Sequence, residues 1–266
     1  MNDIEPKKKS NSVEEIKSLF YVGMIALAIR IFILELYFVP TGSMKATILE
    51  NDYIFSTKYS YGYSKYSFPF SPNIFEGRIL SSKPERGDIV IFRPPHDMDI
   101  RYVKRLIGLP GDKIQLINDV IYINDRPIER NETGEFQDVS GQLYKKYKET
   151  LPNNVSYYSY KLARMSQTNP YSNTDIFYVP SGKYFFLGDN RDESRDSRVD
   201  LGFVPFENFI SKGQFVLFST KEILWRDDKD VVENITRFWL WLKSIRFNRI
   251  FKSLKITYNY NLTVRV

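Results

Sequence analysis

Residues 101–112 read Arg-Tyr-Val-Lys-Arg-Leu-Ile-Gly-Leu-Pro-Gly-Asp. The first part has the apolar content of a buried strand, and Gly108 to Gly111 is a typical turn sequence. In a strand, the side chains of Tyr102, Lys104 and Leu106 share one face. A strand lysine is exposed by default, but apolar burial disfavours the ammonium and can lower its pKa from about 10.4 by several units. The stretch therefore predicts a β-rich fold with Lys104 as a candidate base.

Other segments have the same strand character. The chain has 19 Tyr and 20 Phe against 13 Gly and 13 Pro, and this aromatic content favours strands. Residues 113–123 predict a hairpin that turns at Asn118-Asp119. Residues 129–175 are polar, tyrosine-rich and weakly periodic, so we expect an inserted subdomain there. The remaining predicted strands are Asp52 to Phe55, Asp88 to Phe92, Tyr184 to Leu187 and Gln214 to Phe218.

One long apolar stretch precedes these strands. Residues 18–29 carry no charge, and Lys17 and Arg30 flank them. A membrane-spanning helix needs about 20 apolar residues, so both flanking side chains would have to snorkel towards opposite interfaces. We expect one N-terminal transmembrane helix over residues 13–34, after a polar cytoplasmic tail at 1–12. A cleaved signal peptide and a buried amphipathic helix are the alternatives.

The basic residues predict an orientation for this anchor. Lysines flank its N-terminal side more densely than its C-terminal side, at positions 7, 8, 9 and 17 against 45 and 58. The positive-inside rule then puts the N-terminus in the cytoplasm and the bulk of the chain outside. The net charge of +6 and pI near 9.2 suit an anionic membrane surface or nucleic acid, and do not choose between them.

Two further segments could rest on a membrane. The aromatic residues between Tyr59 and Phe70 fit a half-buried strand, a packed loop or a belt at the lipid interface. The basic C-terminal segment, 223–266, contains a possible amphipathic helix at 233–255, in which tryptophans alternate with basic side chains. That pattern fits a membrane surface or a helix docked on the domain.

Ser43 is the candidate nucleophile. It lies in Val39-Pro40-Thr41-Gly42-Ser43-Met44, and a serine hydroxyl needs a base to take its proton. The only histidine, His96, lies in a proline-bounded loop, so a neutral lysine is the remaining candidate base. The Ser43 N–H and the Thr41 hydroxyl could form an oxyanion hole, although the same residues also fit a plain turn. Lys104 is 61 positions away, so only the tertiary fold can join the pair.

A third polar segment, Gly188 to Arg198, alternates acids and arginines. Interleaved arginines argue against a calcium loop, which needs bare carboxylates. By composition the segment is a structural clamp closed by ion pairs more readily than a catalytic loop. The absence of cysteine, with a single histidine, also argues against a zinc site.

Together these segments resemble bacterial type I signal peptidase, a membrane-bound protease with a Ser/Lys dyad. The resemblance runs from Arg30 to about Thr220, and its motifs occur in the same order as in that family. They are Pro40-Thr41-Gly42-Ser43-Met44, Arg86-Gly87-Asp88-Ile89-Val90, Val103-Lys104-Arg105 with Gly108-Leu109-Pro110-Gly111-Asp112, and Gly188-Asp189-Asn190-Arg191-Asp192 with Asp196-Ser197-Arg198.

The resemblance implies a role for each candidate site residue. Ser43 would be the nucleophile and Lys104 the general base, with the Ser43 N–H and Thr41 hydroxyl as oxyanion donors. Ser194 would hydrogen-bond the Lys104 amine, and Asp196 and Arg198 would form a supporting salt bridge. Substrates would be the signal peptides of exported preproteins, cut after small residues. No metal or organic cofactor is expected.

The resemblance also implies a fold and a location. The fold would be an antiparallel β-sheet catalytic domain, formed by 35–112 and 181–222, with an inserted β subdomain at 113–180. The enzyme would be a monomer in the bacterial cytoplasmic membrane, with its catalytic domain on the periplasmic side of the lipid bilayer. This chain departs from the residues usual in the family at Thr41, Ala46 and Val199 to Leu201. We expect these departures to affect substrate specificity more than the reaction itself.

Other functions remain open from the residues alone. A self-cleaving Ser/Lys repressor would need an N-terminal DNA-binding motif, where this chain has an apolar stretch. A catalytically silent, membrane-tethered β-domain scaffold would be favoured by loss of either dyad residue, and both are present. Nucleic-acid binding is suggested only by charge, with no recognised motif, so we expect no nucleic-acid partner.

Overall fold

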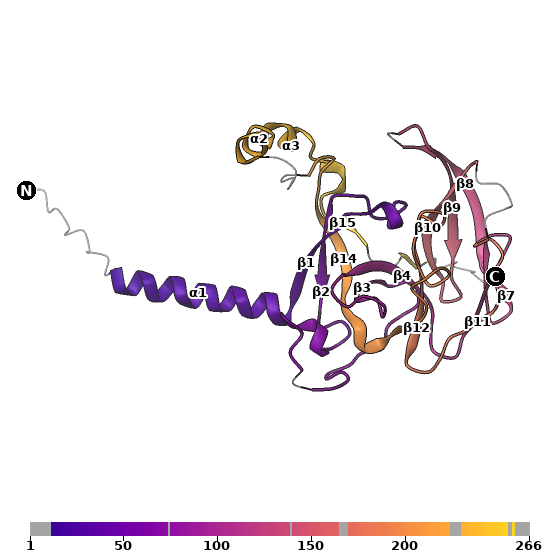
Figure 1. The fold of residues 1–266 in the computed structure, drawn as a ribbon, viewed down its shortest axis with the longest axis horizontal. Helices are drawn as coiled ribbons and strands as arrows, with labels where there is room; N and C mark the ends of the chain where they lie inside the picture. The colour runs from indigo at the N-terminus through magenta and orange to yellow at the C-terminus, as the bar shows by residue number, and fades with distance from the viewer. Residues whose placement is uncertain are drawn as a thin grey trace, which may run out of the picture.

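The computed structural model describes residues 12–73, 75–138, 140–164, 170–223, 230–254 and 257–258, and they form a mainly β fold (Figure 1). The largest sheet has eight strands in the order β1-β2-β14-β3-β4-β12-β13, with β15 paired to β14, and all its pairings are antiparallel. Its strands are β1 (Leu34–Phe38), β2 (Asp52–Thr57), β3 (Ile89–Phe92), β4 (Tyr102–Gly108), β12 (Lys183–Leu187), β13 (Val204–Pro205), β14 (Phe209–Ser219) and β15 (Lys252–Ser253). The predicted antiparallel β fold is confirmed.

The chain between β4 and β12 contributes seven of the eight strands of two smaller four-stranded sheets, and β16, near the C-terminal end of the chain, supplies the eighth. One contains β11 (Phe177–Tyr178), β5 (Lys113–Ile117), β6 (Val120–Ile123) and β7 (Arg126–Pro127), and the other β16 (Thr257–Tyr258), β10 (Val155–Leu162), β9 (Leu143–Thr150) and β8 (Glu129–Gln137). β5 and β6 form the expected hairpin, because Asn118 and Asp119 adopt the positive φ of 49° and 67° that a two-residue turn requires. Since β4 and β12 pair with each other, this region is an insertion between neighbouring strands.

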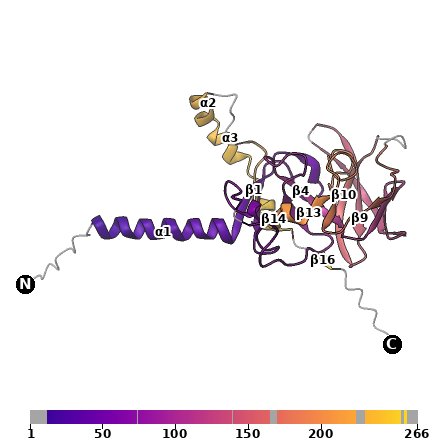
Figure 2. The same ribbon diagram turned by 60° about the horizontal axis from the view of Figure 1, so that its bottom comes forward.

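The N-terminal helix α1 (Ser12–Phe32) projects away from the sheets (Figures 1 and 2). No helix in the described parts of the chain is long and apolar enough to cross a membrane, so the predicted transmembrane helix over 13–34 is not supported. The physical reason is charge: acids and Lys17 in the first turns, and Arg30 near the end, leave too short an uncharged run. The buried-helix alternative is also wrong, because the side chains from 13 to 30 are exposed.

Two other local predictions are corrected. The continuous helix expected at 233–255 is divided into α2 (Val231–Thr236), α3 (Phe238–Lys243) and the short 3-10 helix η4 (Phe247–Arg249), before strand β15. The aromatic segment from Tyr59 forms turns and a 3-10 helix, η2 (Lys65–Ser67), so the strand alternative is wrong and the loop alternative fits the structure. In both places tertiary packing overrides a weak local pattern.

Strand β4 is buried, and its side chains belong to three different hydrophobic clusters of the core. All four residues of β3 are buried, and so are all of β4 after Tyr102. Val103 packs in a cluster with Met44 on one side of the sheet, whereas Leu106 packs with aromatic rings on the other. Ile107 joins a third cluster that continues into the insertion. A side chain on β4 is therefore held in a rigid, largely apolar environment.

Candidate active site

Ser43 is held in a short, anchored turn. It lies in the 3-10 helix η1 (Gly42–Met44), directly after β1, and the Met44 side chain is fully buried beneath it. Asn190 fastens this turn from the segment at 188–198: its backbone N–H donates to the Ser43 carbonyl at 3.0 Å, and its side-chain amide to the Gly42 carbonyl at 3.1 Å. The serine is therefore positioned by two segments that are distant in sequence.

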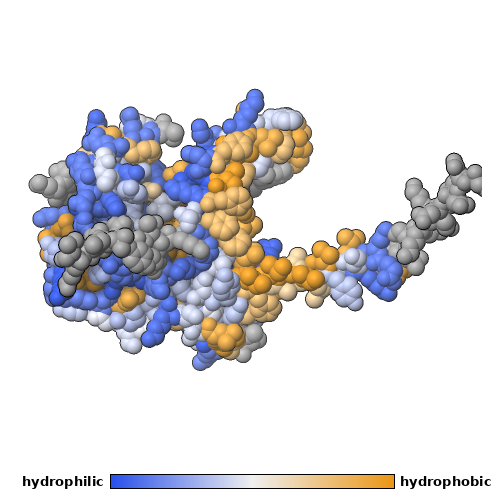
Figure 3. Space-filling view, turned by 180° about the vertical axis from the view of Figure 1, so that it is seen from behind, coloured by the Kyte–Doolittle hydropathy of each residue, from blue (hydrophilic) through white to orange (hydrophobic). Residues whose placement is uncertain are grey.

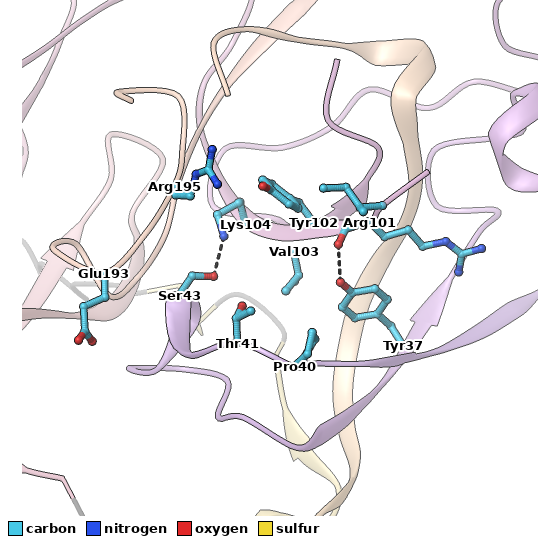
Figure 4. Close-up of a pocket in the computed structure, with 11 residues that line it drawn as sticks. Tyr37, Pro40, Thr41, Ser43, Arg101, Tyr102, Val103, Lys104, Glu193 and Arg195 are labelled. Atoms are coloured by element: carbon cyan, nitrogen blue, oxygen red, sulfur yellow. Dashed lines mark hydrogen bonds between the residues drawn. The ribbon is translucent and has the colours of Figure 1, made fainter. Parts of the chain in front are cut away.

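Lys104 reaches Ser43 from β4. Its amine donates a hydrogen bond of 2.6 Å to the Ser43 hydroxyl oxygen (Figure 4), and the lysine is only 4% exposed. Burial lowers the pKa of Lys104 from its ordinary value to about 8, although the carboxylates of Asp196 and Asp189 act in the opposite direction. A neutral lysine amine at this distance can instead accept the serine proton, so the pair can generate a nucleophile.

The dyad opens into a cavity of about 370 Å³. Figure 4 shows Thr41 on the same side of the cavity as Ser43, with its hydroxyl oxygen turned towards the dyad. Tyr37 extends across another wall, where its hydroxyl donates to the Arg101 carbonyl oxygen at 2.7 Å. Glu193 and Arg195 border the side of the cavity opposite Tyr37.

The supporting residues expected from the resemblance are placed near the dyad, but not all make the expected contacts. Arg198 donates two hydrogen bonds of 2.9 Å to the carboxylate of Asp196, and both residues are buried. The expected hydrogen bond between Ser194 and the Lys104 amine is not formed, and the buried Ser194 hydroxyl has no partner among the described residues. The Lys104 amine is directed to the nucleophile instead.

Close packing joins Ser194 to Ser43 through Gly188. A Cβ atom at position 188 would lie 2.1 Å from the Ser194 hydroxyl oxygen and 2.6 Å from the Ser43 carbonyl oxygen. Only glycine lets these two segments approach so closely. The glycine of the third motif therefore has a steric role that the sequence alone does not reveal.

A buried ion pair behind the dyad was missed by the sequence analysis. Arg105 donates to both carboxylate oxygens of Asp189, at 2.7 and 2.6 Å, and the Thr47 hydroxyl donates to the same carboxylate at 2.5 Å. These contacts join β4, the segment at 188–198 and the chain after Ser43. Arg105 and Asp189 both lie in the motifs quoted above, and their opposite charges were the feature of the sequence from which this pairing could have been predicted.

The metal-ligating residue types and the histidine of the described chain lie as follows. No group of three or more His, Cys, Asp or Glu side chains in those parts of the chain could hold a metal ion. His96 is exposed and stacks edge-on to Tyr102, with ring centres 6.1 Å apart. The hydrogen bond from Lys104 to Ser43 would suit attack by the serine oxygen with proton transfer to the lysine amine.

Comparison with known proteins gives the family. The family model described as signal peptidase, peptidase S26, matches residues 12–218. The chain is 60% identical to the signal peptidase I of Rickettsia canadensis over 258 residues, 95% of this chain and 97% of that protein. It is 62% identical to the signal peptidase I of Rickettsia prowazekii over 246 residues, 91% of this chain and 93% of that protein. A solved signal peptidase I from Enterococcus faecalis is 27% identical, with a TM-score of 0.29, over 49% of this chain and 97% of that one. Because the family model and the Rickettsia sequences match most of its length, this chain belongs to the signal peptidase family, peptidase S26.

Proposed function

We propose that this chain is a signal peptidase that removes signal peptides from exported preproteins, with Ser43 as nucleophile and Lys104 as general base. The observation that carries the proposal is the 2.6 Å contact between the two side chains in a buried site. Burial also brings the pKa of Lys104 to about 8, so a usable fraction of the amine is neutral near physiological pH.

The proposed reaction has two steps. Neutral Lys104 takes the proton of the Ser43 hydroxyl while the oxygen attacks the scissile carbonyl, whose developing negative charge is held by the Thr41 hydroxyl and the Ser43 N–H. The Lys104 ammonium then gives its proton to the leaving amine of the mature protein. As that amine leaves, the Ser43 oxygen remains joined to the signal peptide as an ester. In the second step neutral Lys104 takes a proton from water while the water oxygen attacks the ester carbonyl, and the Lys104 ammonium returns that proton to the Ser43 oxygen as the ester bond breaks.

The shape of the cavity supports substrates with small residues before the cut. Pro40 and Val103 line its wall, and a hydrogen bond to the Arg101 backbone fixes the ring of Tyr37 on another wall of this cavity of about 370 Å³. Alanine-sized side chains fit such a space with little desolvation of polar groups. Because one chain supplies the dyad and the whole cavity, we propose that the monomer is active.

We also propose that the enzyme works against a lipid bilayer, with the catalytic domain at the outer face of the bacterial cytoplasmic membrane. A nearly continuous apolar surface runs from α1 over the sheet edge to α2 and α3 (Figure 3). Its exposed members include Leu36, Phe238, Trp239, Leu240, Phe247 and Phe251. Leu36 lies on β1, which leads directly to Ser43, so the surface and the site are adjacent. Apolar and tryptophan side chains beside basic residues fit a lipid interface.

Cleavage of a preprotein with an Ala-x-Ala site by the detergent-solubilised full chain tests the proposal. Wild type should release the mature protein, whereas Ser43→Ala and Lys104→Arg should not, since arginine cannot act as a neutral base. Lys113→Arg is the matched control, because Lys113 forms an ion pair with Asp125 away from the site. Equal cleavage by wild type and Ser43→Ala would refute the assignment, and a folded wild type that cleaves nothing would favour the scaffold alternative.

Binding to vesicles tests the lipid contact separately. Replacing Trp239 and Leu240 with Glu should reduce co-sedimentation with vesicles that contain phosphatidylglycerol, because apolar burial at the interface is lost. Retained binding would place the lipid contact elsewhere.

A further inference from the structure

We propose that a second depression, beyond Glu193, binds the first residues of the mature protein, immediately after the cleaved bond. The inference rests on the proposed function and adds a substrate site to it. The depression has a volume of about 790 Å³ and lies between the chain that follows Ser43 and the β8–β9 hairpin. Its ligand would be an extended, polar peptide segment.

The depression adjoins the catalytic cavity. Glu193 lines both spaces, and Lys45, two residues after the nucleophile, lines the second. A strand advances about 3.3 Å per residue, so an extended peptide needs only a few residues to pass from one space to the other. A substrate whose scissile bond lies at Ser43 can therefore occupy both spaces, one on each side of the cut.

A series of hydrogen bonds between side chains forms the floor of the depression and connects it to the turn that contains Ser43. The Lys45 ammonium donates to the Asp138 carboxylate (3.1 Å) and to the Tyr144 hydroxyl (3.2 Å), and that hydroxyl donates to the Glu193 carboxylate (2.8 Å). The Asn190 amide donates to the same Glu193 carboxylate (2.7 Å) and to the Gly42 carbonyl oxygen (3.1 Å). Although burial acts to lower it, the pKa of Lys45 is raised, because its hydrogen bonds to Tyr144 and Asp138 favour the ammonium. The floor is thus ordered by charge-assisted contacts.

The catalytic cavity and the second depression are lined by different kinds of side chain, and this difference indicates which part of the substrate each of them binds. Apolar and aromatic side chains line much of the catalytic cavity, which suits the small residues that end a signal peptide. Charged side chains of both signs surround the second depression, among them Glu50, Glu193, Glu222, Lys221 and Arg246. Polar residues at the start of a mature protein fit that setting without burying an unpaired charge.

Two carboxylates, of Glu50 and Glu193, and one ammonium, of Lys45, lie nearest the nucleophile, and the ammonium is already paired with Asp138 at 3.1 Å. Glu193 is bonded to Asn190, which holds Gly42, and the Glu50 carboxylate lies 2.7 Å from the place of a Cβ atom on Gly42. These carboxylates would attract a basic residue just after the cut and repel an acidic one. The structure therefore leads us to expect a charge preference at the second mature residue, with lysine favoured over aspartate.

Matched peptides with one Ala-x-Ala signal sequence test the site. One peptide ends one residue after the cut, and two others continue for five more residues, with Lys or Asp at the second mature position. Wild type should cleave the long Lys peptide better than the short one. It should also prefer Lys to Asp by roughly threefold to fivefold in kcat/KM at low salt, the effect expected of a partly exposed charge.

A charge reversal with a matched control locates the preference. Glu50→Lys should reduce or invert the Lys-over-Asp ratio, whereas Glu132→Lys, the same charge change at an exposed residue of β8 paired with Lys145, should leave it as in wild type. Equal ratios for Glu50→Lys and wild type, or equal changes from both variants, would overturn the site while leaving the proposed function intact. Failure of folded wild type to cleave any of the three peptides would refute the proposed function and this site with it.

Discussion

The pH dependence of cleavage is the sharpest consequence of the buried dyad. Burial lowers the pKa of Lys104 from 10.5 to about 8. At 1.36 kcal/mol per pH unit, that difference corresponds to about 3 kcal/mol of lost stabilisation of the ammonium. Only the neutral amine accepts the Ser43 proton, so activity is present above the pKa and is lost as the pH falls through it.

The magnitude follows from the neutral fraction of the amine. With a pKa of about 8, about one amine in a hundred is neutral at pH 6 and half are neutral at pH 8. We therefore expect kcat/KM to rise about fifty-fold between pH 6 and pH 8 and to level off above about pH 9. An ordinary lysine would instead give a tenfold rise per pH unit that continues to about pH 10.

The assay is cleavage of a peptide that has no titrating side chain near the cut, followed at substrate concentrations below KM. Tryptophan fluorescence at each pH verifies that the protein stays folded. A profile that is flat from pH 6 to pH 8, or one that continues to rise beyond pH 10, would refute the argument that burial tunes Lys104.

Three substitutions test other parts of the site. Lys104→Met should abolish cleavage. In urea titrations at pH 7 it should also raise the free energy of unfolding by about 1–3 kcal/mol, because it removes a buried ammonium. This gain in stability should shrink between pH 8 and pH 10.5, because there the unfolded wild type binds more protons than the folded wild type, which stabilises wild type as the pH rises. Gly188→Ala should lower thermal stability and cleavage together, since its Cβ would lie 2.6 Å from the Ser43 carbonyl oxygen, whereas Gly23→Ala, with no atom within 4 Å, should change neither; equal effects would contradict the close-approach argument. Thr41→Val should reduce kcat by roughly 10²–10³ with little change in KM if its hydroxyl holds the oxyanion, and an unchanged kcat would leave Thr41 as a turn residue.

Local sequence patterns predicted the strands well where the pattern was strong. Residues 88–92 and 102–109 predicted β3 and β4 to within one residue at each end, and the Asn118-Asp119 turn set the β5–β6 hairpin. The patterns failed where they were weak or interrupted. Charges at both ends of α1 left too short an apolar run to cross a membrane, and the basic segment at 233–255 packs as separate short elements.

The motifs predicted Ser43 and Lys104 as nucleophile and base, because a serine and a lysine in motifs of the right order are a chemically specific combination. The sequence could not show that the two side chains meet at 2.6 Å, nor that the Ser194 hydroxyl forms no hydrogen bond with the lysine. It also could not show that Arg105 and Asp189 join the segments behind the dyad.

Residue types and local periodicity determine which chemistry is available and which segments form strands, since both depend on near neighbours. The distance between groups 61 positions apart, and the burial that lowers the pKa of Lys104, depend on how β4 packs against the turn at Ser43 and the segment at 188–198. That packing is the sum of many long-range contacts, so only the tertiary structure decides whether a serine and a lysine become a nucleophile and its base.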